Sequence, residues 1–195
     1  MKHVGIFLFP AIELLDFAGP YEVFSVTAEL NDSRLFKVFT ITGDGAAVKS
    51  VNGLTVVPDF SFADHPSVDI LVIPGGIGTK AILKEAASLD WIRRTAASSA
   101  ITMSVCSGAR ILGILGLLDR LEATTHHEVA EHLKELAPAT IIKQNERFID
   151  NGKIMTSGGV SAGIDLSLHV VRKLYGEAVA DKTIRYMEYG DWQTV

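Results

Sequence analysis

Short apolar runs recur along the chain, and most of them are followed by a stretch with helical periodicity. Runs of this kind are typical of parallel strands that are buried on both faces of a sheet. The runs that we interpret as strands of such a sheet cover residues 3–9, 36–42, 69–76 and 101–105. They are separated by enough residues for a helical crossover between successive parallel strands.

Apolar residues spaced three or four positions apart predict the helices. These cover residues 20–30, 80–87, 89–99, 109–118, 128–136, 164–175 and 177–188. Residues 11–19 are interpreted as an apolar loop, because Pro20 suits the first turn of a helix. The alternation of strands and helices predicts an α/β fold, a three-layer sandwich with a mostly parallel central sheet, in a single domain that spans residues 1–195.

Two Asn-Gly pairs predict hairpins, because Asn and Gly tolerate the positive φ angles of tight turns. Asn52-Gly53 lies between short apolar segments at 48–51 and 54–57, and Asn151-Gly152 lies at the tip of a second hairpin region within residues 140–157. Gly176 is a natural C-cap for the helix before it.

Composition and charge narrow the class of protein. Hydrophobic residues make up 48% of the 195 residues and charged residues 21%, which is typical of a globular domain. The net charge of −5 argues against a nucleic acid bound through its phosphates. The apolar stretch near the N-terminus is too short for a signal peptide or a membrane span, and a single cysteine suits a reducing compartment. We therefore expect a cytoplasmic protein without a membrane partner.

That single cysteine, Cys106, lies where a predicted strand turns abruptly into a predicted helix. Open α/β folds place their sites at such junctions, at the carboxyl ends of the strands. The small residues Ser107 and Gly108 suit a tight nucleophile elbow. The unpaired N–H groups of the new helix would favour a thiolate, so we predict a nucleophile that is ionised at neutral pH. An isolated cysteine is often a small buried apolar residue, but this position favours the reactive role.

Two glycine turns follow predicted strands, at residues 74–78 and 157–159, and should meet the elbow along one edge of the sheet. Neither turn has the spacing of a phosphate-binding loop. Their glycines, Gly75, Gly76 and Gly159, are candidates to place backbone N–H groups near a developing negative charge. Plain tight turns would explain either glycine run equally well.

Asp16 is the candidate acidic partner of Cys106, because its neighbours are too apolar for an ordinary solvated carboxylate. Glu13 is a close competitor. His126 and His127 are weaker candidates, since exposed histidines are common and neither adjoins the cysteine. No H-E-x-x-H order and no second cysteine are present, so we expect neither a metal nor another cofactor.

Taken together, several segments resemble the ThiJ/PfpI superfamily, a class I glutamine amidotransferase-like group, over essentially the whole chain. They are Leu15-Asp-Phe-Ala-Gly-Pro20, Ile73-Pro-Gly-Gly76, Ser104-Val-Cys-Ser-Gly108, Ala123-Thr-Thr-His126 and Gly158-Gly-Val-Ser-Ala-Gly-Ile-Asp165. The first and last of these segments are similar to the isocyanide hydratase branch. The resemblance implies a flavodoxin-like fold and a homodimer with the reactive cysteine close to the subunit interface.

Carried over by position, the resemblance makes Cys106 the nucleophile and Asp16 its acidic partner. Ser107 stands where the hydratase carries a small hydroxyl residue, and Gly76 and Ile77 belong to a loop whose amides face the sulfur. The implied reaction adds water to a small isocyanide substrate to give an N-substituted formamide, without a cofactor.

Two alternatives stay open within the superfamily. One is a sensor or ligand-binding protein, in which Cys106 is oxidised to a sulfenic or sulfinic acid. The other is a glyoxalase-type activity on 2-oxoaldehydes, for which relatives use a Glu from the region of Glu13. No histidine directly follows Cys106 in the sequence, and we do not expect the additional helix-turn-helix domain that the related regulators carry. Similar elbows serve several chemistries, so the fold alone does not decide.

Overall fold

The computed structural model describes residues 1–195, and its centre is a sheet of seven strands. In the order in which they lie side by side, these are β10 (Phe148–Asp150), β11 (Ile154–Ser157), β7 (Ile101–Val105), β6 (Ile70–Ile73), β1 (Lys2–Phe7), β2 (Phe36–Thr42) and β5 (Phe60–Ser61). All neighbours run parallel except β10 and β11, which form an antiparallel hairpin. The predicted mostly parallel sheet is confirmed.

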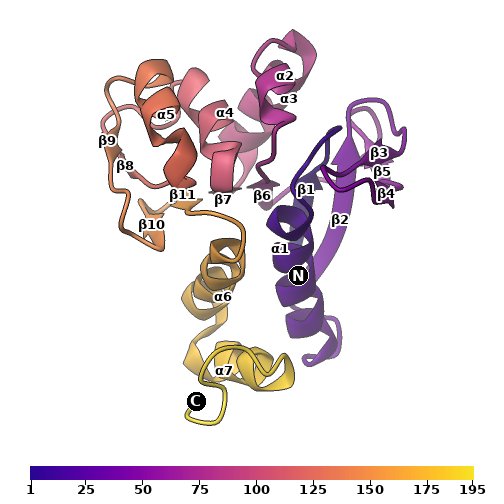
Figure 1. The fold of residues 1–195 in the computed structure, drawn as a ribbon. Coiled ribbons are helices and arrows are strands. Elements are labelled where there is room, and N and C mark those ends of the chain that lie inside the picture. The colour runs from indigo at the N-terminus through magenta and orange to yellow at the C-terminus, as the bar shows by residue number, and fades with distance from the viewer.

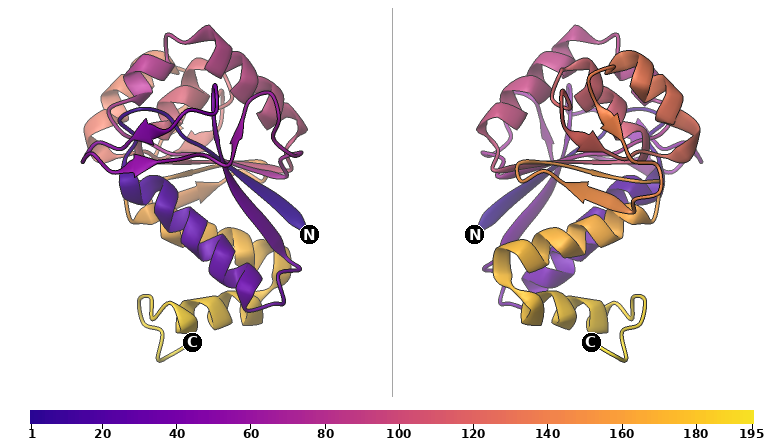
Figure 2. Two further views of the ribbon diagram at one scale, coloured as in Figure 1. Left: turned by 90° about the vertical axis from the view of Figure 1, so that its right-hand side faces the viewer. Right: turned by 90° about the vertical axis from the view of Figure 1, so that its left-hand side faces the viewer.

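Helices cover both faces of this sheet, as Figures 1 and 2 show. One layer contains α1 (Leu14–Glu29), α6 (Ala162–Tyr175) and α7 (Glu177–Tyr186), which pack against one another. The opposite layer contains α2 (Thr79–Ile82), α3 (Ala86–Ser98), α4 (Ala109–Ile114) and α5 (Ala130–Leu136). The three-layer α/β arrangement follows the expectation from the sequence.

The central strands are apolar because both of their faces are covered. Every residue of β6 and β7 is buried, and forty buried residues form one contiguous apolar core. Complete burial of an Ile, Leu or Val side chain contributes about 1.5–3 kcal/mol. The strands with the least exposure therefore fix the position of the loops that follow them.

The first helix differs from the prediction: α1 begins at Leu14, and Pro20 lies inside it. Residues 14–19 are therefore helical and not a loop. A proline in a helix costs about 3 kcal/mol because it removes one hydrogen bond and crowds the preceding turn. Tight packing between α1 and α6 offsets this cost: a Cβ on Gly19 would lie 2.9 Å from Cγ1 of Ile164. The correction moves Asp16 from a loop into the first turn of α1.

Other boundaries also differ. The helix expected at 80–87 is only α2, and the helix expected at 109–118 ends with α4 at Ile114, before Gly116 with φ +71°. The hairpin at Asn52-Gly53 forms between β3 (Val48–Lys49) and β4 (Thr55–Val56). The second hairpin, with Asn151-Gly152 at its tip, forms between β10 and β11 as predicted, whereas β9 (Ile141–Ile142) pairs with β8 (Glu122–Ala123) as a parallel pair outside the main sheet. Gly176 ends α6 with φ +89°, as predicted.

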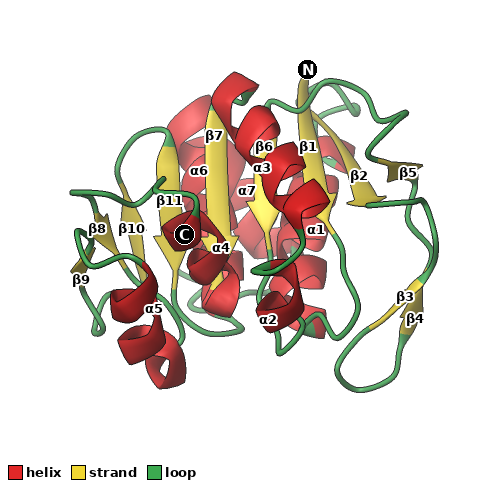
Figure 3. Ribbon diagram, turned by 90° about the horizontal axis from the view of Figure 1, so that it is seen from above, coloured by secondary structure: helices red, strands yellow, loops and turns green.

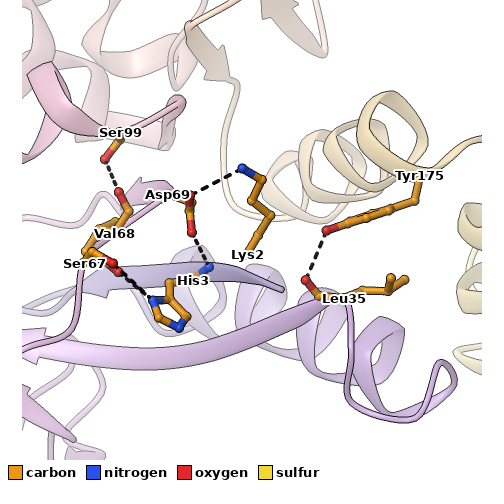
Figure 4. Close-up of polar contacts among 8 residues, drawn as sticks. All are labelled: Lys2, His3, Leu35, Ser67, Val68, Asp69, Ser99 and Tyr175. Atoms are coloured by element: carbon orange, nitrogen blue, oxygen red, sulfur yellow. Dashed lines mark hydrogen bonds and ion pairs between the residues drawn. The ribbon is translucent and has the colours of Figure 1, made fainter.

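Polar groups at the amino ends of the central strands are paired within the protein (Figure 4). Asp69 accepts a hydrogen bond from the backbone N–H of His3 at 2.8 Å and forms an ion pair with Lys2. The hydroxyl of Ser99 donates to the carbonyl of Val68 at 3.0 Å. These contacts close the amino edge of the sheet, where they serve the fold.

The arrowheads of β1, β6, β7 and β11 point to the opposite edge, on the side where α2 and α5 lie (Figure 3). The loops after these strands meet there, as expected for the site of an open α/β sheet. No helix is long and apolar enough to span a bilayer.

Candidate active site

Cys106 occupies a sharp turn between β7 and a short 3₁₀ turn, Cys106–Gly108, that leads into α4. Its φ angle is +56°, an unusual conformation for a residue other than glycine, and such strain is held only when the surroundings enforce it. Two hydrogen bonds do so. The N–H of Cys106 donates to the carbonyl of Gly158 at 3.0 Å, and the hydroxyl of Thr125 donates to the carbonyl of Cys106 at 2.8 Å.

The turn also needs Gly108, because a Cβ there would lie 2.2 Å from the carbonyl oxygen of Ile73 in β6. The elbow is thus pressed against the neighbouring strand. The predicted strand-to-helix elbow is present, and it presents the Cys106 side chain at the carboxyl edge of the sheet.

Asp16 lies beneath this elbow and is fully buried, with 0% of its surface exposed. Its Oδ2 accepts a hydrogen bond from the backbone N–H of Gly75 at 2.9 Å, while Oδ1 has no conventional hydrogen-bond partner. The Cys106 thiol lies close enough to this carboxyl group for each of the two to shift the pKa of the other. The structure therefore brings together the two residues that the sequence proposed as partners.

The thiol and the carboxyl titrate as a coupled pair. Burial raises the pKa of Asp16 to about 7. Burial, followed by the negative charge of Asp16, raises the pKa of Cys106 to about 12. The expectation of a thiolate at neutral pH is therefore wrong, because desolvation outweighs the short helix that follows the elbow. Between these two values the pair retains one proton.

The amides of Gly75 and Gly76 are not free to bind a negative charge. The N–H of Gly75 donates to Asp16, and the N–H of Gly76 donates to Oγ of Ser107 at 2.9 Å. The Ser107 hydroxyl in turn donates to the carbonyl of Gly76 at 3.2 Å. Gly159 packs against the ring of His126 and does not line the cleft beside Cys106. The proposed oxyanion role of Gly75, Gly76 and Gly159 is not supported.

Different amides face the sulfur. The N–H groups of Ser107 and Val160 lie near the Cys106 side chain, and both lower the pKa of its thiol without overcoming the effect of burial. Val160 has φ +44°, which turns the loop after β11 toward the elbow. Val160 could not be identified from the sequence, because an apolar side chain gives no sign that its backbone amide is used.

A cleft of about 360 Å³ opens beside the sulfur. Its walls come from five separate segments of the chain: Glu13, Gly76, Ile77, Lys80, Cys106, Ser107, Arg110, His126, Glu128, Val129 and Val160. A second hollow of about 370 Å³ lies between Phe7, Phe9 and Phe62, but it contains no nucleophile. The first cleft is therefore the candidate active site.

The structure also places Glu13, His126 and His127, the other candidates for the partner of Cys106. Glu13 and His126 line the cleft, whereas His127 lies outside it and is largely exposed. The Nδ1 of His126 accepts from the N–H of Glu128 at 3.3 Å, so this ring caps a short 3₁₀ turn, His127–Val129. No three His, Cys, Asp or Glu side chains gather in an arrangement that would hold a metal ion.

The raised pKa of Asp16 predicts a specific dependence of stability on pH. Between about pH 4 and 7 the native carboxyl retains a proton that the unfolded chain releases, so the free energy of unfolding should fall as the pH rises. Asp16→Asn preserves the shape of the side chain but cannot titrate. Urea unfolding of both proteins over this range should show a smaller decline in the variant. A constant difference between the two curves would contradict the raised pKa.

The fold and this site define a class of protein: a parallel α/β sandwich with a cysteine on a strained elbow above a buried carboxyl group. A sequence model of the DJ-1/PfpI family matches residues 2–173. The chain belongs to this family.

Individual relatives differ in what they do. The chain is 34% identical over 186 residues to isonitrile hydratase of Pseudomonas putida, which covers 95% of this chain and 78% of that protein. It is 25% identical to the transcriptional regulator GbdR of Pseudomonas aeruginosa over 92% of this chain, but this match spans only 48% of the regulator.

Solved structures agree on the architecture. A ThiJ/PfpI family protein from Pseudomonas syringae superposes with a TM-score of 0.87 at 28% identity, over 96% of this chain and 75% of that one. DJ-1beta of Drosophila melanogaster superposes with a TM-score of 0.83 over 97% and 98% of the two chains, at 19% identity. This second likeness concerns the fold alone.

Proposed function

We propose that the protein is a cofactor-independent hydro-lyase that adds water to an isocyanide, also called an isonitrile, and releases an N-substituted formamide. The observation that carries this proposal is the fully buried carboxyl of Asp16 in contact with the Cys106 thiol. The 34% identity to an isonitrile hydratase supports the same activity. The pair offers both a nucleophile and a means of moving its proton.

In the first step, the sulfur of Cys106 attacks the terminal carbon of the isocyanide. The Asp16 carboxylate takes the thiol proton and delivers it to that carbon, which receives the new C–S bond and the new C–H bond. The product is a thioimidate with a C=N double bond.

In the second step, water attacks the carbon of the thioimidate. Asp16 accepts a proton from the water and passes it to the imine nitrogen. Collapse of the adduct to the formamide then breaks the C–S bond while Asp16 takes the hydroxyl proton, which it returns to the sulfur. The departing sulfur carries negative charge, which the N–H groups of Ser107 and Val160 stabilise until Cys106 regains its proton. The sum is one isocyanide and one water converted into one formamide.

The amides of Gly75 and Gly76 bind Asp16 and Ser107, so these two amides are not free to stabilise the oxyanion of peptide or ester cleavage. Attack on an isocyanide instead produces a carbanion-like carbon, for which a proton donor is the group required. The same two amides that would form an oxyanion hole serve here to hold the acid and the loop.

Turnover of para-nitrophenyl isocyanide provides the direct test. We expect the formamide to accumulate with many turnovers per chain, measured by chromatography against a buffer blank. A 2-oxoaldehyde such as methylglyoxal should be consumed more slowly under the same conditions. Formamide production no faster than in the blank would overturn the hydratase proposal.

A glyoxalase-type activity is the second candidate, because Glu13 lines the cleft beside Cys106. Faster consumption of methylglyoxal than of the isocyanide would favour it. A redox-sensor role is less well supported, because redox-sensing cysteines have low pKa values and that of Cys106 is raised. A homodimer and a cytoplasmic location remain predictions from the sequence.

A further inference from the structure

Arg110 is a buried cation without a counter-ion at the wall of the cleft. Only 6% of its surface is exposed, yet no carboxylate lies within 4.0 Å of its guanidinium group. Its Nη1 makes one long hydrogen bond of 3.4 Å to the hydroxyl of Thr79, and its Nε has no partner. A buried charge is normally paired, because leaving it unpaired costs several kcal/mol.

The position of Arg110 follows from the elbow. It lies in the first turn of α4, which directly follows the elbow, and its side chain lines the same cleft as Cys106. The other charged groups in this cleft are Glu13, Lys80 and Glu128, from three other segments, and none of them forms an ion pair with Arg110. A purely structural arginine would be expected to have found an acceptor among them.

We propose that Arg110 binds a carboxylate group of the substrate, and that the substrate is therefore a small isocyanide that also carries a carboxylate. This inference rests on the proposed function for the reacting carbon, but the anion site itself does not depend on it. The planar guanidinium presents parallel N–H donors that match the two oxygens of a carboxylate. A cleft of about 360 Å³ suits a small molecule that spans the distance from Arg110 to the sulfur.

Alkylation of Cys106 tests the site without any hydratase activity. Iodoacetate and iodoacetamide carry the same electrophilic carbon, but only the former carries a carboxylate. Because Cys106 is the only cysteine, mass spectrometry reports the reaction of one sulfur. The ratio of the two alkylation rates cancels the fraction of thiolate, since both reagents attack through the same group. This ratio therefore measures how strongly the cleft favours an anion.

We expect Arg110→Met to lower the iodoacetate-to-iodoacetamide ratio by roughly 10- to 100-fold, the range for loss of a charge-assisted contact. Arg110→Lys should retain part of the preference, because it keeps the charge but not the planar pair of donors. The matched control is Arg93→Met, which removes the same charge from an exposed ion pair with Asp90 on α3. Thermal unfolding verifies that each variant is folded.

An unchanged ratio in a folded Arg110→Met protein, or an equal fall in Arg93→Met, would overturn the anion site. If Arg110→Met does not fold, protection of the wild-type thiol decides instead. Acetate should slow alkylation by iodoacetamide at concentrations where acetamide does not, and equal effects of the two would reject the site.

Turnover of isocyanoacetate and of its methyl ester separates this inference from the proposed function. We expect kcat/KM to be higher for the acid, and to fall in Arg110→Met for the acid alone. Hydration of both compounds with equal kcat/KM would leave the hydratase in place and reject the carboxylate substrate. An Arg110-dependent alkylation ratio without hydration of either compound would retain the anion site and reject the hydratase.

Discussion

Cys106→Ser should abolish hydration of para-nitrophenyl isocyanide, with kcat/KM lower by on the order of 10⁴-fold or more. Serine fits the same elbow, but its hydroxyl is a far weaker nucleophile than a thiol. The buried site cannot compensate, because it already disfavours negative charge on the cysteine sulfur. The measurement is formamide formation under single-turnover and steady-state conditions.

A suitable control is Met103→Leu, which changes a fully buried side chain of β7, the strand that precedes Cys106, without altering the cleft. It should cost less than about 1.5 kcal/mol of stability and leave activity largely intact. If Cys106→Ser retained more than about one hundredth of the activity, the covalent mechanism would have to be abandoned.

Asp16→Asn should lower kcat/KM by on the order of 10²–10⁴-fold, as expected for the loss of a group that transfers protons. Asparagine can still accept the hydrogen bond from the Gly75 N–H, so the loop should stay in place. The pH profile adds a second readout. In the wild-type protein kcat/KM should rise as the pH increases through about 7, where the carboxyl loses its proton, and then level off.

Asp16→Asn should lack this inflection in the pH profile of kcat/KM, because asparagine does not titrate. Glu13→Gln is the matched comparison, because it removes another carboxylate from the same cleft without touching the buried acid. We expect it to retain activity within about tenfold of the wild type, a smaller loss than that of a general acid–base. A dead Glu13→Gln protein together with an active Asp16→Asn protein would reverse the assignment and favour the glyoxalase-type chemistry.

The sheet could be predicted because its central strands are buried on both faces and are apolar throughout, as in the Ile70–Ile73 strand. The start of α1 could not, because Gly19 and Pro20 are strong local signals against a helix. Contacts with Ile164, distant in the sequence, outweigh them. Local preference fails at this point because tertiary packing decides the conformation.

The sequence predicts which segments of the chain meet at the site, but not the hydrogen bonds that they form there. Strands β1, β6 and β7 had to place Asp16, the Gly75 turn and Cys106 along one edge. The sequence could not show which amides remain free, since the bonds that occupy them join residues 31 and 59 positions apart. Arg110 could have been suspected from the sequence, because it lies at the start of the helix predicted directly after Cys106.

The residues that cover the Cys106 thiol also determine how exposed it is while the chain is being synthesised. Cys106 is held by the carbonyl of Gly158 and faced by the amide of Val160, which are synthesised later. At about 5–20 residues per second, the ribosome needs roughly three to eleven seconds to add residues 107–160. During that interval the thiol lacks its cover and has the ordinary pKa of about 8.5. We therefore expect the nascent protein to be more open to oxidation than the mature one until the loop after β11 folds against the elbow.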